Sequence, residues 1–168
     1  MRTTGTGMKG IVVALLALSA LAACSTSGTG KDRRDEAVEV QSYVFESGIA
    51  TLPPRTMEAG QCGLFLWSKM PQRELVFFSR SSDMAGDMII DGTARFLKRT
   101  LAEGEGFYGQ FTRQIFAGEG YEVQLLLEPE IRDGMADSVV IPRGSLRLKK
   151  PDGWEHVMAV GGLVSCRK

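Results

Sequence analysis

The chain is poor in the residues on which most catalytic sites depend. It has 168 residues, among them one histidine, three cysteines and two tryptophans. A hydrolase needs a nucleophile, a base and an orienting group, and a single histidine, His156, leaves few ways to assemble them. No G-x-S-x-G motif occurs either. We therefore expect no catalytic residue and predict that the protein is not an enzyme.

The chain also lacks an excess of charge of either sign. Lysine plus arginine and aspartate plus glutamate number 20 each, and no basic stripe is present that could neutralise a run of phosphates, so we expect no nucleic-acid partner. Asp83, Asp87 and Asp91 recur every four residues, whereas a calcium loop alternates its ligands more closely and ends in a bidentate glutamate. We expect neither a metal site nor a cofactor.

No hydrophobic run is long enough to span a membrane. The longest, residues 11–23 (IVVALLALSALAA), falls short of the roughly 20 apolar residues of a transmembrane helix. Arg2 and Lys9 precede it and small residues end it, as in a secretory signal peptide. We therefore expect residues 1–23 to be removed on export. Met8 is an alternative start to Met1.

The four residues that close this run, LAAC at positions 21–24, resemble the lipobox of bacterial lipoproteins. The resemblance implies that Cys24 receives a diacylglyceryl group and further acylation such as palmitate, becomes the first residue and anchors the protein in a membrane. Ser25 after it implies the outer membrane of a Gram-negative cell, on the periplasmic side. The alternative is an ordinary signal peptide cut after Ala23, which leaves a free thiol that lipidation would remove.

Two cysteines remain besides Cys24. Export places Cys62 and Cys166 where disulfides persist, so we predict that they pair with each other. Because they lie far apart in the sequence, the bond would enclose nearly the whole domain and stabilise it. A redox role would need a closely spaced C-x-x-C pair, which is absent.

The mature chain divides into two parts. Residues 24–38 are polar and charged and have few apolar side chains to bury. We therefore predict that they form a lipidated flexible tether with a reach of roughly 20 Å. Residues 39–168 are of a length typical of one domain.

Short runs of period-two alternation, separated by Gly, Pro and Asp, predict that this domain is all-β and antiparallel. The Asp91-Gly92 dipeptide favours a two-residue turn of type I′. A helix over residues 94–102 is an alternative, because Ala94, Leu97 and Leu101 also lie at helical spacing. The expected strands are residues 38–45, 62–68, 75–79, 88–90, 93–97, 107–116, 121–127, 138–141, 145–148 and 154–160.

A closed or nearly closed β-barrel is the expected architecture, and a two-sheet β-sandwich is the alternative. Cys62 heads an early strand and Cys166 follows the last one, so a bond between them would hold the two ends of the chain together. Closing the sheet also removes exposed edges.

These observations predict a lipid-anchored envelope lipoprotein that acts as a non-enzymatic binding or structural module. Its expected partners are the membrane, through the anchor, and an envelope protein or cell-wall component. His156 shares a strand face with Trp154 and Met158, and we expect it to be structural. One alternative is a periplasmic enzyme inhibitor, similar in architecture only to the small disulfide-closed β-barrel lipoproteins that block c-type lysozyme. Another is a carrier of a small apolar ligand, held in a cavity lined by aromatic residues.

Overall fold

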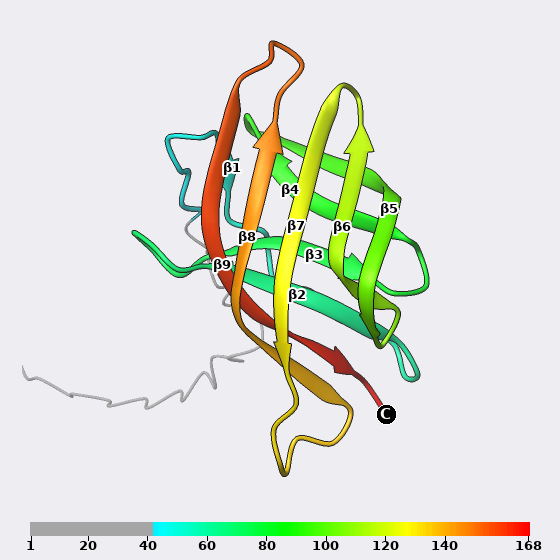
Figure 1. Cartoon of the computed structure of the whole chain (residues 1–168). Helices are drawn as coiled ribbons and strands as arrows, with labels where there is room; N and C mark the ends of the chain where they lie inside the picture. The colour runs from blue at the N-terminus through cyan, green and yellow to red at the C-terminus, as the bar shows by residue number, and fades with distance from the viewer. Residues whose placement is uncertain (1–41) are drawn as a thin grey trace, which may run out of the picture. The chain divides into compact units, whose positions relative to one another are not determined.

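The computed structural model describes residues 42–168, which fold into a closed eight-stranded antiparallel β-barrel with one extra strand and no helix (Figure 1). The predicted barrel is therefore confirmed over the sandwich. The signal peptide, Cys24 and the tether lie outside the described residues. The strands are β1 (Ile49–Ala50), β2 (Cys62–Ser68), β3 (Leu75–Arg80), β4 (Ala85–Ile90), β5 (Thr93–Phe107), β6 (Gln110–Gly118), β7 (Tyr121–Glu130), β8 (Ser138–Lys149) and β9 (Glu155–Cys166).

Strands β2 to β9 form a meander in which each strand pairs with the next and β9 returns to β2. The closing ladder joins seven residue pairs, from Cys62 opposite Cys166 to Ser68 opposite Val160. In Figure 1 strands β6, β7 and β8 cross in front of β2 and β3, the strands of the opposite wall. Closure leaves none of these eight strands with a free edge, which removes the usual template for aggregation.

The β3–β4 contact is the sparsest part of the barrel wall, with one registered residue pair, Phe78 opposite Asp87. Strand β1 pairs with the end of β4 at this place. Two residues further on, the Leu52 N–H donates a hydrogen bond to the Leu75 carbonyl of β3 at 2.7 Å. The segment that begins with β1 therefore bridges β4 and β3 and satisfies backbone groups that would otherwise be unpaired.

Apolar side chains fill the interior of the barrel. Strand alternation directs Leu64 and Leu66 of β2 inward and leaves Phe65 and Trp67 half-buried on the outer face. Burying each large apolar side chain contributes about 1.5–3 kcal/mol. The largest fully buried side chains are Phe77, Phe78, Phe116, Ile49, Leu52, Leu64, Leu66, Met88, Ile90, Leu97, Leu125 and Ile141.

The helix considered for residues 94–102 is wrong, because these residues lie in β5. Arg95, Leu97, Arg99 and Leu101 are the less exposed positions of this segment, which is the period of a strand. Two of the four are arginines, so the alternation of polarity that identifies a strand is weak. The Asp91-Gly92 turn is confirmed, since Asp91 (φ 51°) and Gly92 (φ 72°) both have positive φ, as a type I′ turn requires.

Most predicted strands have different bounds in the structure, and the difference is largest at three places. The first, residues 38–45, extends beyond the described residues, and its described part contains only an isolated bridge from Val44 to Ala50. The run 107–116 is interrupted by a turn at Tyr108-Gly109, where both φ angles are positive. Residues 138–141 and 145–148 belong to one strand, β8, with an irregularity between Ile141 and Gly144. In each of the last two cases the hydrophobic alternation does not reveal where the chain turns or bulges.

Candidate binding site

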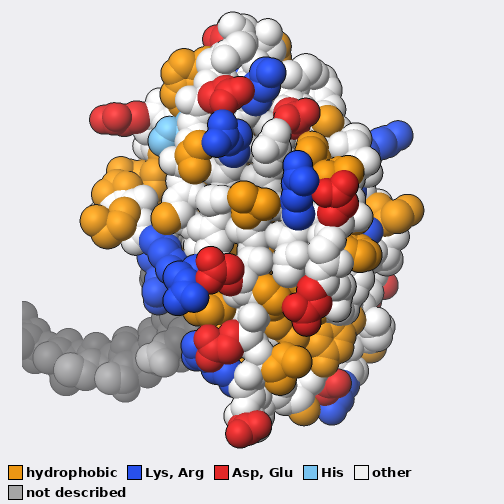
Figure 2. Space-filling model, viewed as in Figure 1, with side chains coloured by type: hydrophobic (Ala, Val, Ile, Leu, Met, Phe, Trp, Pro, Cys, Tyr) orange, Lys and Arg blue, Asp and Glu red, His pale blue; other side chains and the backbone are white. Residues whose placement is uncertain are grey.

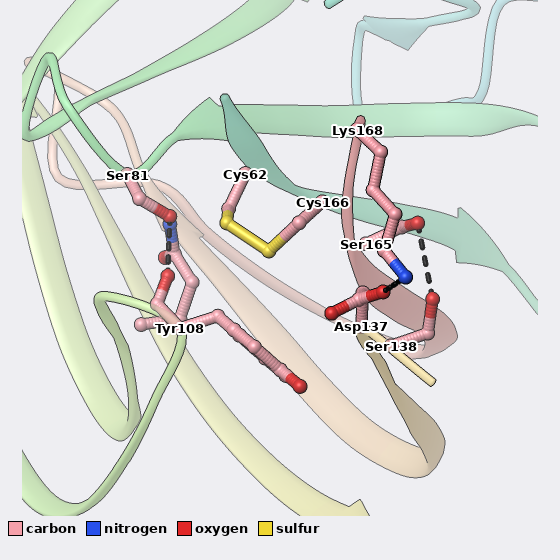
Figure 3. The surroundings of a disulfide bond; sticks show 9 residues. Cys62, Ser81, Tyr108, Asp137, Ser138, Ser165, Cys166 and Lys168 are labelled. Carbon is pink, nitrogen blue, oxygen red and sulfur yellow. Dashed lines mark hydrogen bonds and ion pairs between the residues drawn. A yellow bond between two sulfur atoms is a disulfide. The ribbon is translucent and has the colours of Figure 1, made fainter. Parts of the chain in front are cut away.

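The predicted disulfide is present in the structure. Cys62 begins β2 and Cys166 ends β9, and the two residues are opposite each other in the β2–β9 ladder. The bond therefore joins the strands whose pairing closes the barrel (Figure 3). Cys24, the predicted lipidation site, is not among the described residues.

Polar contacts around the disulfide connect neighbouring segments of the chain. The Ser138 hydroxyl lies 3.1 Å from that of Ser165 across β8 and β9. Lys168 forms an ion pair of 2.6 Å with Asp137, and this hydrogen bond raises the pKa of the Lys168 ammonium above its ordinary value. The Ser81 hydroxyl donates to the Tyr108 carbonyl, as Figure 3 shows. These contacts are structural, because none of them pairs a nucleophile with a base.

His156 has the surroundings of a packing residue. Its ring stacks on that of Trp154, with centroids 5.6 Å apart and planes 3° from parallel. It is half-buried and lines a second pocket, of about 440 Å³, with Met70 and Met158. Within residues 42–168 no hydrogen bond joins it to a carboxylate or hydroxyl, so it does not form part of a catalytic triad there.

The strongest candidate for a ligand site is a pocket of about 440 Å³ on the outer face of the barrel, where β2, β8 and β9 meet. We call it the outer-face pocket. Its size lies in the range of about 300–1,000 Å³ typical of small-molecule sites. It is lined by Trp67, Ser68, Lys69, Arg73, Val140, Ile141, Pro142, Gly161, Gly162 and Leu163.

Strand register explains why this part of the wall is hollow. Gly161 of β9 lies directly opposite Trp67 of β2, and because a glycine has no side chain, the flank of the indole remains uncovered. On the other side of β9, the ladder to β8 is irregular between Ile141 and Gly144, which is the effect of a bulge. Pro142, within this bulge, forms the opposite wall of the pocket.

Gly162, which follows Gly161 in β9, allows the barrel to close. A Cβ atom at Gly162 would lie 1.9 Å from the carbonyl oxygen of Phe65, far inside any ordinary contact. Glycine at this position therefore lets β9 approach β2 closely. At Gly161 the nearest atoms to such a Cβ are Lys69 Cε at 3.1 Å and the Ile141 carbonyl oxygen at 3.2 Å, so the Lys69 side chain lies over Gly161 on its way to the Pro142 carbonyl.

One end of the pocket is cationic. Lys69 Nζ donates a hydrogen bond of 2.6 Å to the Pro142 carbonyl, and Arg73 lies on the same connection between β2 and β3. Nine ion pairs occupy other lysines and arginines of the described chain, but neither Lys69 nor Arg73 has a carboxylate partner within residues 42–168. Figure 2 shows several basic side chains at the left of this view, with acidic side chains next to them.

The other end is apolar. Leu163 lies between Phe65 on β2 and Val140 on β8, and Phe65 stacks against Trp67 with centroids 6.0 Å apart. The pocket therefore has an apolar end, an aromatic wall and a cationic end, as binding sites for small molecules commonly do. Sequence reasoning missed this site. The only local signals were an aromatic residue near the end of β2 followed by the cation Lys69, and the Gly161-Gly162 pair inside a strand.

Comparison of the chain with protein-family models, with curated proteins and with solved structures finds no match. Within residues 42–168 there is no cluster of three or more His, Cys, Asp or Glu side chains that could hold a metal ion. The same part of the chain has no helix long and apolar enough to cross a membrane.

Proposed function

We propose that this protein is a lipid-anchored binding module of the cell envelope that works without catalysis. The lipobox-like sequence at residues 21–24 supports an anchor on Cys24, at the periplasmic side of the outer membrane. The observation that carries the binding role is the outer-face pocket, because Trp67, Lys69 and Arg73 line one hollow from neighbouring parts of the chain.

The interior of the barrel is a poor place for a ligand. Its core positions, including Leu66, Phe77, Phe116 and Leu125, have no exposed surface, and a ligand there would have to displace close-packed side chains. A carrier of the kind that encloses an apolar molecule within a wide barrel therefore has less support than a module that binds on its outer face.

Binding, rather than catalysis, also agrees with the surroundings of His156. Stacking on Trp154 holds the ring without supplying the hydrogen-bonded base and orienting group that acyl transfer requires. The outer-face pocket brings two cations, an indole and backbone carbonyls together, and this set can hold a ligand but contains no nucleophile activated by a base.

Complementation tests the proposal. In a strain that lacks the gene, Trp67→Ala should fail to restore the envelope phenotype at matched abundance, whereas Trp154→Ala, which removes the other tryptophan, and His156→Gln should restore it. A Trp67→Ala protein that complements fully would contradict a binding role for the pocket. Failure of His156→Gln, together with turnover of an envelope substrate by the wild type alone, would contradict the non-enzymatic role.

A further inference from the structure

We propose that the outer-face pocket binds a small amphipathic anion, a carboxylate joined to an apolar body such as a medium-length acyl chain. This inference rests on the proposed binding function and names the class of ligand. It follows from the polarity of the pocket, whose cationic end is at Lys69 and Arg73 and whose apolar end is at Val140 and Leu163.

The cationic end is suited to a carboxylate. An ammonium has three donors, and Lys69 uses one of them on the Pro142 carbonyl, so two remain for a ligand. Arg73 carries a planar fork that matches a carboxylate in bidentate geometry. Both side chains are exposed, so an exposed anion gains little from each alone. The apolar contacts must supply the rest of the affinity.

The apolar part of the pocket has the shape for a narrow body. Outward positions along β9 are Val157, Ala159, Gly161 and Leu163, which carry no charge. Gly161 adds no side chain of its own beside the Trp67 indole, and Leu163 and Val140 continue the uncharged lining of the pocket. Each methylene that leaves water there contributes about 0.8 kcal/mol. An apolar body of several methylenes therefore adds enough affinity for an anion to saturate the site, which Lys69 and Arg73 alone would bind only weakly.

Direct titration tests this class of ligand. The Cys24→Ser chain is used throughout, because it needs no detergent that could fill the pocket. Replacing Trp154 by Phe leaves Trp67 as the only tryptophan of the chain and as the fluorescent reporter. The probes are decanoate, decanol and decyltrimethylammonium below their micelle concentrations, and acetate as an anion without an apolar body. Calorimetry measures the same four probes.

Decanoate should saturate the site and change the Trp67 emission. Decanol should bind at least about tenfold more weakly, which corresponds to about 1.4 kcal/mol, and decyltrimethylammonium and acetate should not saturate. Equal binding of decanoate and decanol would overturn the cationic part of the inference. Acetate binding as tightly as decanoate would reduce the site to a simple anion site and overturn the apolar part.

A pair of matched variants locates the effect. Lys69→Gln/Arg73→Gln should lose the preference for decanoate over decanol, whereas Lys98→Gln/Lys149→Gln, which removes two exposed lysines of β5 and β8 outside the pocket, should keep it. Unchanged preference in the first variant would place the binding elsewhere and overturn the inference. Circular dichroism of both variants shows whether they are folded, and Leu163→Ala, which keeps both cations, should weaken decanoate and decanol alike.

The outcomes separate this inference from the function on which it rests. If decanoate does not bind but Trp67→Ala still fails to complement, the pocket is functional and the ligand class is wrong. If decanoate binds at the pocket and Trp67→Ala complements, the ligand class stands and the proposed cellular role is wrong. Binding only of a protein partner to this face would likewise overturn the ligand class.

Discussion

Replacing the closing disulfide by Cys62→Ala/Cys166→Ala should remove a large part of the stability of the barrel. The bond encloses a loop of 104 residues, and the chain-entropy expression assigns a loop of this size about 4.7 kcal/mol at 25 °C. Typical domains are stable by about 5–15 kcal/mol. The loss is therefore comparable with the whole margin of a weakly stable domain.

The corresponding change in melting temperature follows from the size of the domain. An unfolding entropy of about 2.1 cal/mol/K per residue, over about 127 residues, gives about 0.27 kcal/mol/K. A loss of about 4.7 kcal/mol then lowers the Tm by about 17 °C. The variant should still fold at low temperature, because the remaining residue pairs of the β2–β9 ladder, ending at Ser68 and Val160, do not depend on the bond.

Urea unfolding followed by circular dichroism, with every protein carrying Cys24→Ser, measures the change. The control is Ser138→Ala/Ser165→Ala, which removes a neighbouring cross-strand hydrogen bond and keeps the disulfide, at an expected cost of about 1 kcal/mol. A disulfide variant that loses no more stability than this control would refute the loop-entropy argument. Intact mass spectrometry without reductant that finds both thiols of Cys62 and Cys166 open to alkylation would refute the bond itself.

Three further changes have defined outcomes. Cys24→Ser should release the protein from membranes, because it would remove the proposed lipid anchor, whose several acyl chains would give stable attachment; fractionation checks this, and wild-type protein that takes up no labelled fatty acid would contradict it. His156→Gln should leave function intact, whereas loss of a general base costs about a hundredfold or more in rate, as a complementation assay at matched abundance can measure. Gly162→Ala should lower the free energy of unfolding by about 2–3 kcal/mol or more, because its Cβ would overlap the Phe65 carbonyl. The control Gly118→Ala, whose Cβ would have ordinary contacts of 3.4 Å, should lower it by less than about 1 kcal/mol in the same urea titration.

The architecture of the domain was accessible from local patterns and from the cysteines. Residues 62–68 were predicted with the bounds of β2, because an apolar run ended by polar residues identifies a buried strand. The Asp91-Gly92 turn follows from the positive φ that this dipeptide tolerates. Cys62 and Cys166 indicated that the ends of the sheet meet, since the predicted export and lipidation of Cys24 would leave these two thiols to pair.

The predicted strand boundary at residue 97 is wrong because the polarity of the side chains in β5 does not follow their burial. Arg95 and Arg99 occupy less exposed positions of β5, where contacts with aromatic rings decide the packing. The guanidinium carbon of Arg95 lies 4.8 Å from the centre of the Tyr121 ring. Such side chains bury their aliphatic stems, and the Arg95 guanidinium pairs with Glu119. A hydrophobicity pattern counts them as polar, so it predicts only residues 93–97 of this strand and leaves a helix as an alternative.

The outer-face pocket could not be predicted because its walls are distant in sequence. Trp67 and Lys69 are in or next to β2, whereas Pro142 and Gly161 belong to β8 and β9. Only the register of a closed barrel brings Gly161 opposite Trp67. A bulge such as that after Ile141 depends on the mutual fit of two strands and has no reliable signature in either one.

Barrel closure and the outer-face pocket depend on the same stretch of β9. Val160 to Cys166 pair with β2 on one side, while residues of this stretch also pair with β8 on the other. The Gly161-Gly162 pair permits the close approach of β9 to β2, and the same absence of side chains opens the pocket beside Trp67. A substitution at either glycine would therefore change both the stability of the barrel and the shape of the pocket. Lys69 and Arg73 lie on the exposed connection between β2 and β3, so variants at these two positions change the chemistry of the pocket without altering the ladder that closes the barrel.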